Sequence, residues 1–326
     1  MIVITGGAGF IGSNLAAALE ERGESEIVIC DRFGPGDKWR NLGKRELALL
    51  LPPEELLDYL EDQGPKIQAV FHMGAISSTT EPDIDLTLQT NFTLSQKLWR
   101  WCTNTGTRFI YASSAATYGD GSAGFDDNSA ALGTLRPLNA YGWSKHLFDR
   151  RVMRLSAGRG SRASQWVGLK FFNVYGPNEY HKGSMRSVVH QVFEGVRAGK
   201  RATLFRSHNP QYADGGQLRD FIYVRDCVSV ILWLYDNPDV SGLFNCGTGQ
   251  ARSFKDLAEA VFRALGKEPE IDYIDTPLEI RDKYQYFTEA RMDRLRAAGY
   301  QGTPTPLEEG VRDYVQSFLT APDPYR

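Results

Sequence analysis

Cysteine and histidine are both scarce in this sequence, and their spacing excludes two kinds of site. Only four cysteines occur among 326 residues, at positions 30, 102, 227 and 246, together with five histidines. Neither set is spaced like the ligands of a metal site or the bridges of a disulfide framework. We therefore predict no bound metal and expect each cysteine to be a small buried apolar residue.

Strong net charge and long apolar runs are absent as well. The net charge is only −3 and the basic residues are scattered, so nothing favours a nucleic-acid partner. No run approaches the roughly 20 apolar residues that a membrane span requires. A core-like strand at residue 1 argues against a signal peptide. We expect a cytoplasmic protein with no membrane partner, long enough for one large or two modest domains.

One stretch, Met1 to Asn14, has a clear organisation. It reads MIVITGGAGFIGSN: a short run of mostly β-branched residues, a glycine turn and the start of a helix. Gly6 can adopt backbone angles closed to other residues, Gly9 lets main-chain N–H groups reach a pyrophosphate, and Gly12 lets the helix lie close to the strand. Asp31 ends the next strand, where an acidic residue meets the adenosine ribose. This arrangement predicts dinucleotide binding.

Strand-like and helix-like segments alternate through the first half of the chain. We expect strands at residues 1–4, 26–31, 67–72, 108–112 and 166–172, and helices at 15–22, 45–62, 91–105 and from 141 onward. This alternation predicts an α/β fold, a Rossmann-like doubly wound parallel sheet with helices on both faces. We assign residues 1–172 to a dinucleotide-binding domain and 173–326 to a smaller C-terminal substrate domain. Segments at about 220–250 are expected to return to the sheet.

Tyr141 and Lys145 lie four residues apart, which places them on one face of the expected helix. A phenol has a pKa of about 10, too high for a base at neutral pH. An ammonium about 4 Å away, at an effective dielectric constant of about 20, would favour the phenolate by roughly 4 kcal/mol and lower that pKa to about 7. Ser114, at the end of a strand, can hydrogen-bond the oxygen whose proton Tyr141 removes. The pattern predicts a base beside a bound hydride acceptor.

Five motifs together resemble the extended short-chain dehydrogenase/reductase family. They are the glycine turn and residues 111–115, 141–145, 173–177 and 219–224. Narrower segments resemble the branch of that family that epimerises ADP-heptoses at C6″, and they lie at residues 77–81, 113–119, 181–185 and 284–288. The resemblance implies an NADP-dependent nucleotide-sugar epimerase that forms a transient 6″-ketone during synthesis of lipopolysaccharide inner-core precursors. It also implies a homo-oligomer, with a pentamer as one candidate form.

The same resemblance implies roles for individual residues. The catalytic set is Ser114, Tyr141, Lys145 and, as a second acid or base, Lys182. Positions expected to bind the cofactor are Gly6, Gly9, Phe10, Ile11, Gly12, Asp31, Arg32, Lys38, Met73, Gly74, Ala75, Ile76, Ser77, Asn91, Lys145, Val174 and Lys182. Positions expected to bind the substrate are Ser114, Asn173, Ser184, Gln191, Phe205, Arg206, Ser207, His208, Arg219 and Tyr284.

The sequence departs from the family pattern in three places. The loop at 207–218 is longer than usual, residues 50–55 lack a lysine that can help to hold the cofactor, and Gln191 stands where a substrate-contacting histidine can occur. These departures put the adenosine contacts of the 207–218 loop and one cofactor contact in doubt. They also give His190 no expected role.

Four alternatives follow from the same residues. Asp31 alone would favour NAD, whereas Arg32 and Lys38 supply positive charge for the 2′-phosphate of NADP, which we choose with NAD as the alternative. A hexose 4-epimerase is the second enzyme candidate. A 4,6-dehydratase is disfavoured because Ser114 is followed by two alanines with no titratable group. A non-catalytic NADP-binding regulator is the third reading, but such proteins typically lose the tyrosine or the lysine of the pair.

Overall fold

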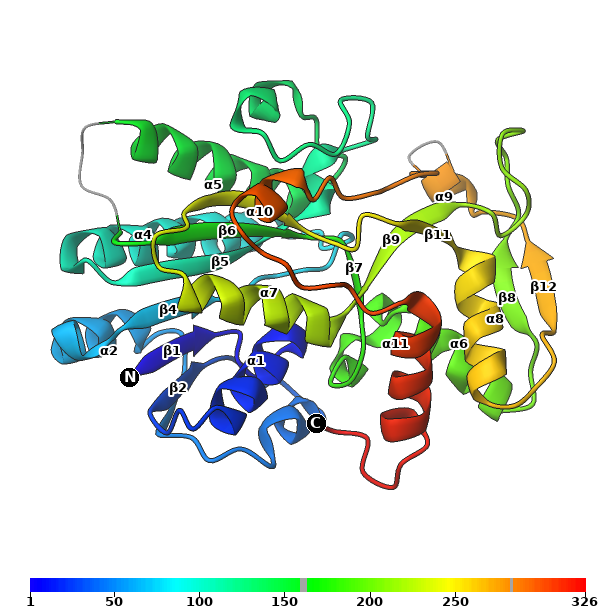
Figure 1. The fold of residues 1–326 in the computed structure, drawn as a ribbon, viewed down its shortest axis with the longest axis horizontal. Helices are drawn as coiled ribbons and strands as arrows, with labels where there is room; N and C mark the ends of the chain where they lie inside the picture. The colour runs from blue at the N-terminus through cyan, green and yellow to red at the C-terminus, as the bar shows by residue number, and fades with distance from the viewer. Residues whose placement is uncertain (159–162, 282–283) are drawn as a thin grey trace.

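A computed structural model describes residues 1–158, 163–281 and 284–326. Within these residues the large sheet has seven strands in the order β10-β6-β5-β4-β1-β2-β3, and all neighbours are parallel (Figure 1). The strands are β1 (Ile2–Thr5), β2 (Ile27–Cys30), β3 (Leu49–Leu51), β4 (Ala69–His72), β5 (Arg108–Ser114), β6 (Trp166–Phe171) and β10 (Gly242–Cys246). The predicted doubly wound parallel sheet is confirmed.

Helices cover both faces of this sheet, which explains why β1 is apolar at consecutive positions. The covering helices are α1 (Phe10–Glu21), α7 (Val224–Asp236) and α10 (Asp293–Ala297) on one face, and α2 (Leu56–Gln63), α4 (Leu94–Thr105) and α5 (Ala140–Ala157) on the other. Successive side chains of a strand point to opposite faces. Ile4 accordingly belongs to the buried cluster of α1 and α7, whereas Val3 belongs to that of α2, α4 and α5. A strand covered on both faces needs an unbroken apolar run.

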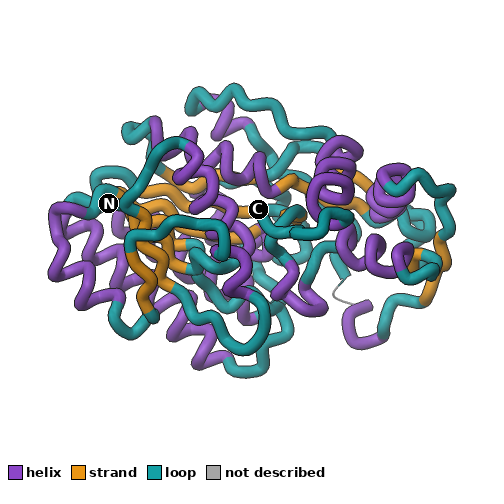
Figure 2. The backbone as a smooth tube through the Cα atoms, turned by 90° about the horizontal axis from the view of Figure 1, so that it is seen from below, coloured by secondary structure: helices purple, strands orange, loops and turns teal. Residues whose placement is uncertain are grey.

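The remaining elements form a smaller layer at one end of the elongated molecule (Figure 2). Its strands are β7 (Asn173–Tyr175), β8 (Ala202–Phe205), β9 (Leu218–Tyr223), β11 (Ala251–Ser253) and β12 (Ile271–Ile274), paired in the orders β11-β9-β7 and β12-β8. Its helices are α6 (Val188–Arg197), α8 (Phe254–Ala264), α9 (Leu278–Arg281) and α11 (Leu307–Asp313). Helices α6, α8 and α11 share one apolar cluster. That cluster is separate from the two clusters of the large sheet.

Two elements late in the chain belong to the large sheet. Helix α7 packs against α1, and β10 pairs with β6, so that Leu243 lies opposite Gly168. Residues 173–326 therefore contribute to both layers, as expected for segments near 220–250. The division into two domains at residue 172 stays a prediction.

The expected helix at residues 45–62 is wrong for its first half. Residues Leu49–Leu51 form β3 at the edge of the sheet, with Leu49 opposite Val28. Pro52 and Pro53 follow directly, and α2 begins only at Leu56. Proline lacks the N–H that a helix interior requires, so the apolar run before it adds to the sheet edge instead. The expected helix at 91–105 begins earlier than predicted, because α3 (Ile84–Leu88) continues through a π-helical turn, Gln89–Thr93, into α4.

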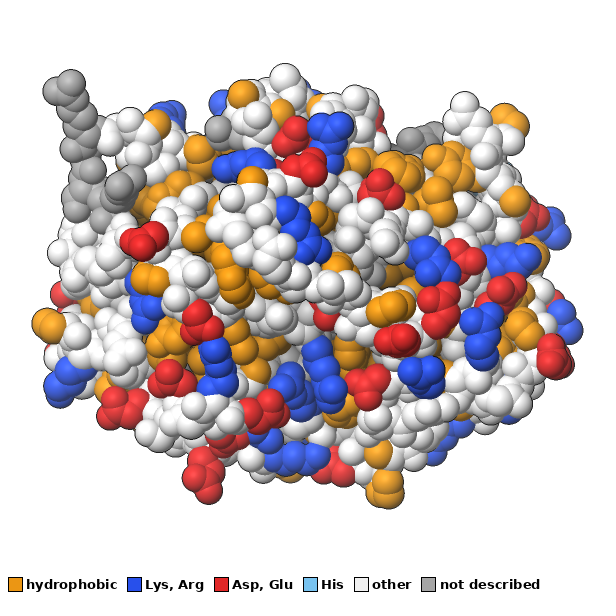
Figure 3. Space-filling view, viewed as in Figure 1, with side chains coloured by type: hydrophobic (Ala, Val, Ile, Leu, Met, Phe, Trp, Pro, Cys, Tyr) orange, Lys and Arg blue, Asp and Glu red, His pale blue; other side chains and the backbone are white. Residues whose placement is uncertain are grey.

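The surface and the cysteines agree with the compositional expectations. Figure 3 shows basic and acidic side chains interspersed on one face of the molecule. All four cysteines are buried and unpaired, as expected. Within the described parts of the chain, no helix has the length and apolar character that crossing a membrane would take. The same parts contain no group of three or more His, Cys, Asp or Glu residues arranged to hold a metal ion.

Candidate active site

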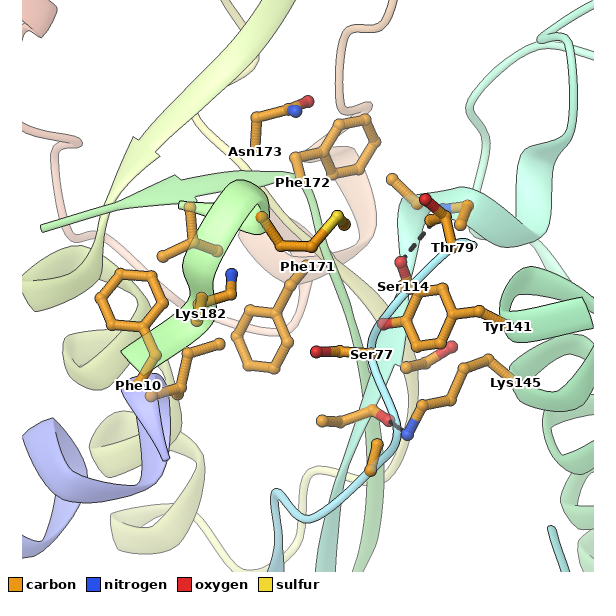
Figure 4. Close-up of a pocket in the computed structure, with 18 of the residues that line it drawn as sticks. Phe10, Ser77, Thr79, Ser114, Tyr141, Lys145, Phe171, Phe172, Asn173 and Lys182 are labelled. Atoms are coloured by element: carbon orange, nitrogen blue, oxygen red, sulfur yellow. Dashed lines mark hydrogen bonds between the residues drawn. The ribbon is translucent and has the colours of Figure 1, made fainter. Parts of the chain in front are cut away.

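A cavity of about 900 Å³ lies where the carboxyl ends of the sheet strands meet the smaller layer (Figure 4). Its lining comes from the glycine turn after β1, the ends of β4, β5 and β6, the start of α5 and residues of the smaller layer. Ligands of open α/β sheets bind at this edge, outside the carboxyl ends of the strands. The cavity is therefore the natural location for the predicted site.

The glycine turn has the shape that a dinucleotide requires. Gly6 has a φ of +65°, and a Cβ on it would lie 2.5 Å from the Cα of Gly74. A Cβ on Gly12 would lie 2.2 Å from the carbonyl oxygen of Gly6. Helix α1 starts at Phe10 after the N-cap residue Gly9, with no side-chain cap and no acidic residue in its first turn. Its N–H groups and partial positive charge are therefore available to a pyrophosphate, and the residues fit that group.

The acidic residue after β2 is held by several donors. The carboxylate of Asp31 accepts hydrogen bonds from the main-chain N–H of Ala8 at 2.9 Å, the N–H of Arg32 at 2.7 Å and the Lys38 ammonium at 2.7 Å. Asp31 and Lys38 line the cavity, whereas the Arg32 guanidinium forms an exposed ion pair with Glu54. The positive charge expected near the ribose therefore comes from Lys38. Arg32 lies outside the cavity lining.

Residues Met73–Ser77 form a segment after β4 that lies beside the glycine turn. The amide of Asn91 holds this turn by accepting from the N–H of Ile76 at 2.8 Å and donating to its carbonyl at 2.9 Å. Asn91 also donates to the Ser144 hydroxyl at 3.0 Å, which connects the turn to α5. Met73, Gly74, Ala75 and Ser77 line the cavity, while Ile76 and Asn91 are not part of its lining.

The predicted catalytic residues Ser114, Tyr141 and Lys145 meet on one side of the cavity. Asn139 caps α5 by accepting from the N–H of Gly142 at 2.8 Å, which places Tyr141 in the first turn. The Lys145 ammonium donates to the carbonyl oxygen of Ala112 at 2.8 Å, and burial lowers the Lys145 pKa to about 8. The lysine is thus buried one turn below the tyrosine.

In the absence of a bound cofactor, the surroundings of Tyr141 do not favour its phenolate. Burial raises the pKa of its phenol above the ordinary value, a hydrogen bond with Ser114 opposes this, and the charge of Asp149 adds to the increase. The Lys145 ammonium, which donates to the Ala112 carbonyl, is not among the groups that lower this pKa. A further positive charge near the phenol is needed to make Tyr141 a base at neutral pH.

Lys182 lies on the opposite side of the cavity from Tyr141, with Phe171 and Ser77 between them (Figure 4). It belongs to the 3₁₀ segment Tyr180–Met185, and its ammonium lies 5.3 Å from the ring centroid of Phe10. Burial lowers the Lys182 pKa, and the buried carboxylate of Glu179 partly opposes this. A lysine with a lowered pKa can exchange a proton near neutral pH.

The segment that carries Lys182 is fixed at its two ends. The carboxylate of Glu179 accepts from the N–H of Ser187 at 2.5 Å and from its hydroxyl at 2.6 Å. The Tyr180 hydroxyl donates to the carbonyl of Pro324 at 2.7 Å. These contacts close the short loop, so that Lys182 is presented from an anchored backbone.

On the smaller-layer side, Asn173, Val174, Arg219 and Tyr284 line the cavity. The Arg219 guanidinium lies 5.3 Å from the Tyr284 ring centroid and donates to the Leu218 carbonyl at 2.8 Å. Burial lowers the Arg219 pKa from its ordinary value, yet the group stays cationic. This buried cation suits an anionic part of a ligand, such as a pyrophosphate.

Several residues predicted to bind the substrate lie outside the cavity lining. They are Ser184, Gln191, Phe205, Arg206, Ser207 and His208. The Gln191 amide donates to the Arg186 carbonyl at 2.8 Å, and the His208 imidazole accepts from the N–H of Thr276 at 3.2 Å. The Phe205 ring centroid lies 6.1 Å from that of Tyr284, which does line the cavity. Their substrate contacts stay predictions.

Sequence reasoning also left lining residues without a role. They include Thr79, Thr80, Leu138, Asn139, Phe171, Phe172, His181, Met185, Gln285 and Thr288. Several lie next to predicted positions or inside the segments at residues 77–81, 181–185 and 284–288. Their place in the sequence could therefore have indicated a role in the site. Asn139 could have been recognised as the helix cap two residues before Tyr141. Leu138 and Phe172 carry no such signal.

Comparisons with known proteins agree with this geometry. Residues 2–247 match the family model described as the NAD dependent epimerase/dehydratase family. The chain is 51% identical over 327 residues to a protein of Nitratidesulfovibrio vulgaris named ADP-L-glycero-D-manno-heptose-6-epimerase, with all of both chains covered. The crystal structure of the Helicobacter pylori ADP-L-glycero-D-manno-heptose-6-epimerase is similar, with a TM-score of 0.80, 30% identity and coverage of 98% and 96%. The Thermus thermophilus UDP-glucose 4-epimerase in complex with NAD gives a TM-score of 0.77 at 26% identity, with 98% and 99% covered.

Proposed function

Because this chain belongs to the NAD dependent epimerase/dehydratase family, we propose that it converts ADP-D-glycero-β-D-manno-heptose to ADP-L-glycero-β-D-manno-heptose by epimerising C6″. One observation carries the proposal: Tyr141 and Lys182 face the same cavity from opposite sides, beside a turn that fits a dinucleotide. The full-length relatives of that name support this substrate.

The reaction begins with Tyr141. Its phenolate takes the proton of the C6″ hydroxyl, the Ser114 hydroxyl hydrogen-bonds the same oxygen, and the C6″ hydrogen leaves as hydride, which gives a 6″-ketone. When bound, the nicotinamide accepts this hydride and later returns it, and its positive charge favours the phenolate. This positive charge would oppose the effect of burial, which raises the pKa of the Tyr141 phenol.

Lys182 completes the epimerisation. The ketone turns over in the cavity, C6″ regains the hydride on its other face, and the Lys182 ammonium gives its proton to the ketone oxygen. Two electrons leave the sugar with the hydride and two return, so no net oxidation occurs. Tyr141 ends protonated and Lys182 ends neutral, and a proton exchange with water restores both. Arg219 is proposed to hold the pyrophosphate while the sugar turns.

We propose NADP as the cofactor, with NAD as the alternative. Family membership supports a nicotinamide dinucleotide in general, and Lys38 supports the 2′-phosphate in particular. Its ammonium lies 2.7 Å from the Asp31 carboxylate and lines the cavity, so it reduces the repulsion that Asp31 would exert on that phosphate.

Replacing Lys38 with methionine should weaken NADP binding by about 10- to 100-fold, because one charge-assisted hydrogen bond contributes about 1.5–3 kcal/mol. Affinity for NAD should change much less. Titration of both dinucleotides at fixed salt measures this, and Lys66→Met, at an exposed lysine, is the matched control. Equal losses for NADP and NAD would contradict the assignment.

The function itself is tested by incubating the purified protein with each ADP-heptose epimer and analysing the products by NMR. We expect each epimer to give a mixture of both. Conversion of UDP-glucose to UDP-galactose instead would favour the hexose 4-epimerase alternative, and NADP binding without any conversion would favour the regulator. Because Tyr141 and Lys145 both line the cavity, we expect catalysis.

Under the proposed function the protein acts in the cytoplasm on precursors of the lipopolysaccharide inner core. Its small-molecule partner is ADP-heptose, and we expect it to work as a homo-oligomer, with a pentamer as one candidate form. Sedimentation analysis of the purified chain measures the oligomeric state directly.

A further inference from the structure

A buried ion pair joins β6 to α5, the helix that carries Tyr141 and Lys145, and the proposed reaction does not use it. Asp149, on α5, and Lys170, on β6, both have side chains with 0% exposure, and the Lys170 ammonium lies 2.6 Å from the Asp149 carboxylate. Asp149 follows Tyr141 by two helical turns and Lys145 by one. Two opposite charges without access to water are costly to bury, so their placement calls for a reason.

Each partner also has neutral hydrogen-bond partners from neighbouring elements. The Asp149 carboxylate accepts from the hydroxyls of Tyr111 at 2.9 Å and Ser113 at 2.7 Å, both on β5. The Lys170 ammonium donates to the Thr117 hydroxyl at 2.7 Å. Ser113 and Lys170 are also paired directly across β5 and β6. The network thus joins α5, β5 and β6 immediately behind Ser114, at the end where the cavity opens.

This network connects the elements that carry the reacting groups. Helix α5 carries Tyr141 and Lys145, and β5 ends at Ser114. A shift of α5 along the sheet would move the phenol relative to the Ser114 hydroxyl. We propose that Asp149 and Lys170 are positioning residues that hold α5 in register against β5 and β6. This inference rests on the proposed function of Tyr141 and extends it.

The charged and titratable groups around the pair are few. On α5 itself they are Lys145 and His146, both of which respond to the Asp149 charge. On the packed elements they are Tyr111 of β5, which donates to Asp149, and Tyr118, whose ring centroid lies 5.1 Å from the Lys170 ammonium. Tyr141 responds to the Asp149 charge, which raises its pKa.

The sign of each charge at Tyr141 gives a distinctive test. Eight residues of helix place Asp149 about 12 Å from Tyr141, a separation at which one charge moves a titration by about one pH unit at an effective dielectric constant of about 20. Lys170→Met leaves the carboxylate uncompensated and disfavours the phenolate, so the rising limb of the kcat–pH profile should move up by about one pH unit. Asp149→Asn leaves the cation and should move it down by about as much.

The double variant D149N/K170M separates alignment from folding. It keeps an amide oxygen for Tyr111 and Ser113 and removes both charges, so it should unfold near the temperature of the unchanged protein. Its pH midpoint should also be unchanged. Its kcat should fall about 10-fold or more with KM unaltered, because loosening the register misplaces the phenol. This variant keeps the test decisive if a single variant fails to fold.

The outcomes distinguish this inference from the proposed function. No epimerisation by the unchanged protein would overturn the function itself. Normal epimerisation, with a full kcat in D149N/K170M, would overturn the positioning role alone. Single variants that fold but lose activity with no opposite displacement of their pH midpoints would do the same, since a merely structural pair predicts that result.

Discussion

Replacing Tyr141 with phenylalanine is expected to lower kcat for ADP-heptose epimerisation by about 10²- to 10⁴-fold, the usual contribution of a general base. The ring stays in place, so the cavity keeps its shape, and only the proton acceptor is lost. Conversion followed by NMR measures the loss. NADP binding should be unchanged, because Phe10, which directly follows the glycine turn at Gly9, lies across the cavity from Tyr141.

The prediction for Tyr141→Phe also specifies which of the two epimers the variant can still oxidise. If Tyr141 serves only one epimer, the variant should fail to oxidise ADP-D-glycero-D-manno-heptose but should still oxidise the L epimer in a single turnover. The absorbance of the reduced nicotinamide reports that step. Tyr235→Phe is the matched control, since this tyrosine lies on α7 away from the cavity. Full turnover in Tyr141→Phe would refute the base assignment.

Replacing Lys182 with methionine is expected to lower kcat for net epimerisation to a similar extent, by about 10²- to 10⁴-fold. Methionine keeps an unbranched side chain of similar length, so packing against Phe10 is retained while the proton donor is removed. The anchored loop around Lys182 should hold the variant's backbone in place, because Glu179 still binds Ser187. Product analysis by NMR measures the loss.

The single-turnover pattern should be the reverse of that of Tyr141→Phe. The D epimer should reduce the nicotinamide once and stop, whereas the L epimer should not react, because its base is missing. Lys200→Met, at an exposed lysine after α6, is the matched control. If both variants failed with the same epimer, one residue would not be a base, and the two-base mechanism would be abandoned.

The part of the fold nearest the glycine turn could be predicted from the sequence because its causes are local. The turn depends on Gly6 and Gly12, where any Cβ would collide with backbone atoms. The strand before it, β1, and the neighbouring strand β2 are short, mostly apolar runs that are fully buried. Asn139, which caps α5 and lines the cavity, was not predicted, although an asparagine two residues before Tyr141 is a local signal for a helix cap.

The errors arose where distant partners decide the structure. Leu49–Leu51 looked helical with its neighbours, but β2 offered an unpaired edge that no local pattern reveals. Arg32, expected to bind the cofactor, pairs with Glu54 outside the cavity lining, so that role stays a prediction. The Lys145 ammonium donates to the Ala112 carbonyl, a partner that the spacing of Tyr141 and Lys145 does not indicate. The partner of a long side chain often comes from a distant part of the sequence, so it becomes known only from the folded structure.

The place of β10 in the sheet has a consequence for how the protein is made. Its residues, Gly242–Cys246, pair with β6 at the sheet edge, and α7 just before them covers α1. A ribosome must therefore synthesise well over half of the chain before β10 can complete the seven-stranded sheet. Until then β6 presents an open, apolar edge, the kind of surface on which nascent chains associate. We expect chains released at residue 172 to aggregate, and chaperones to be needed most during that interval.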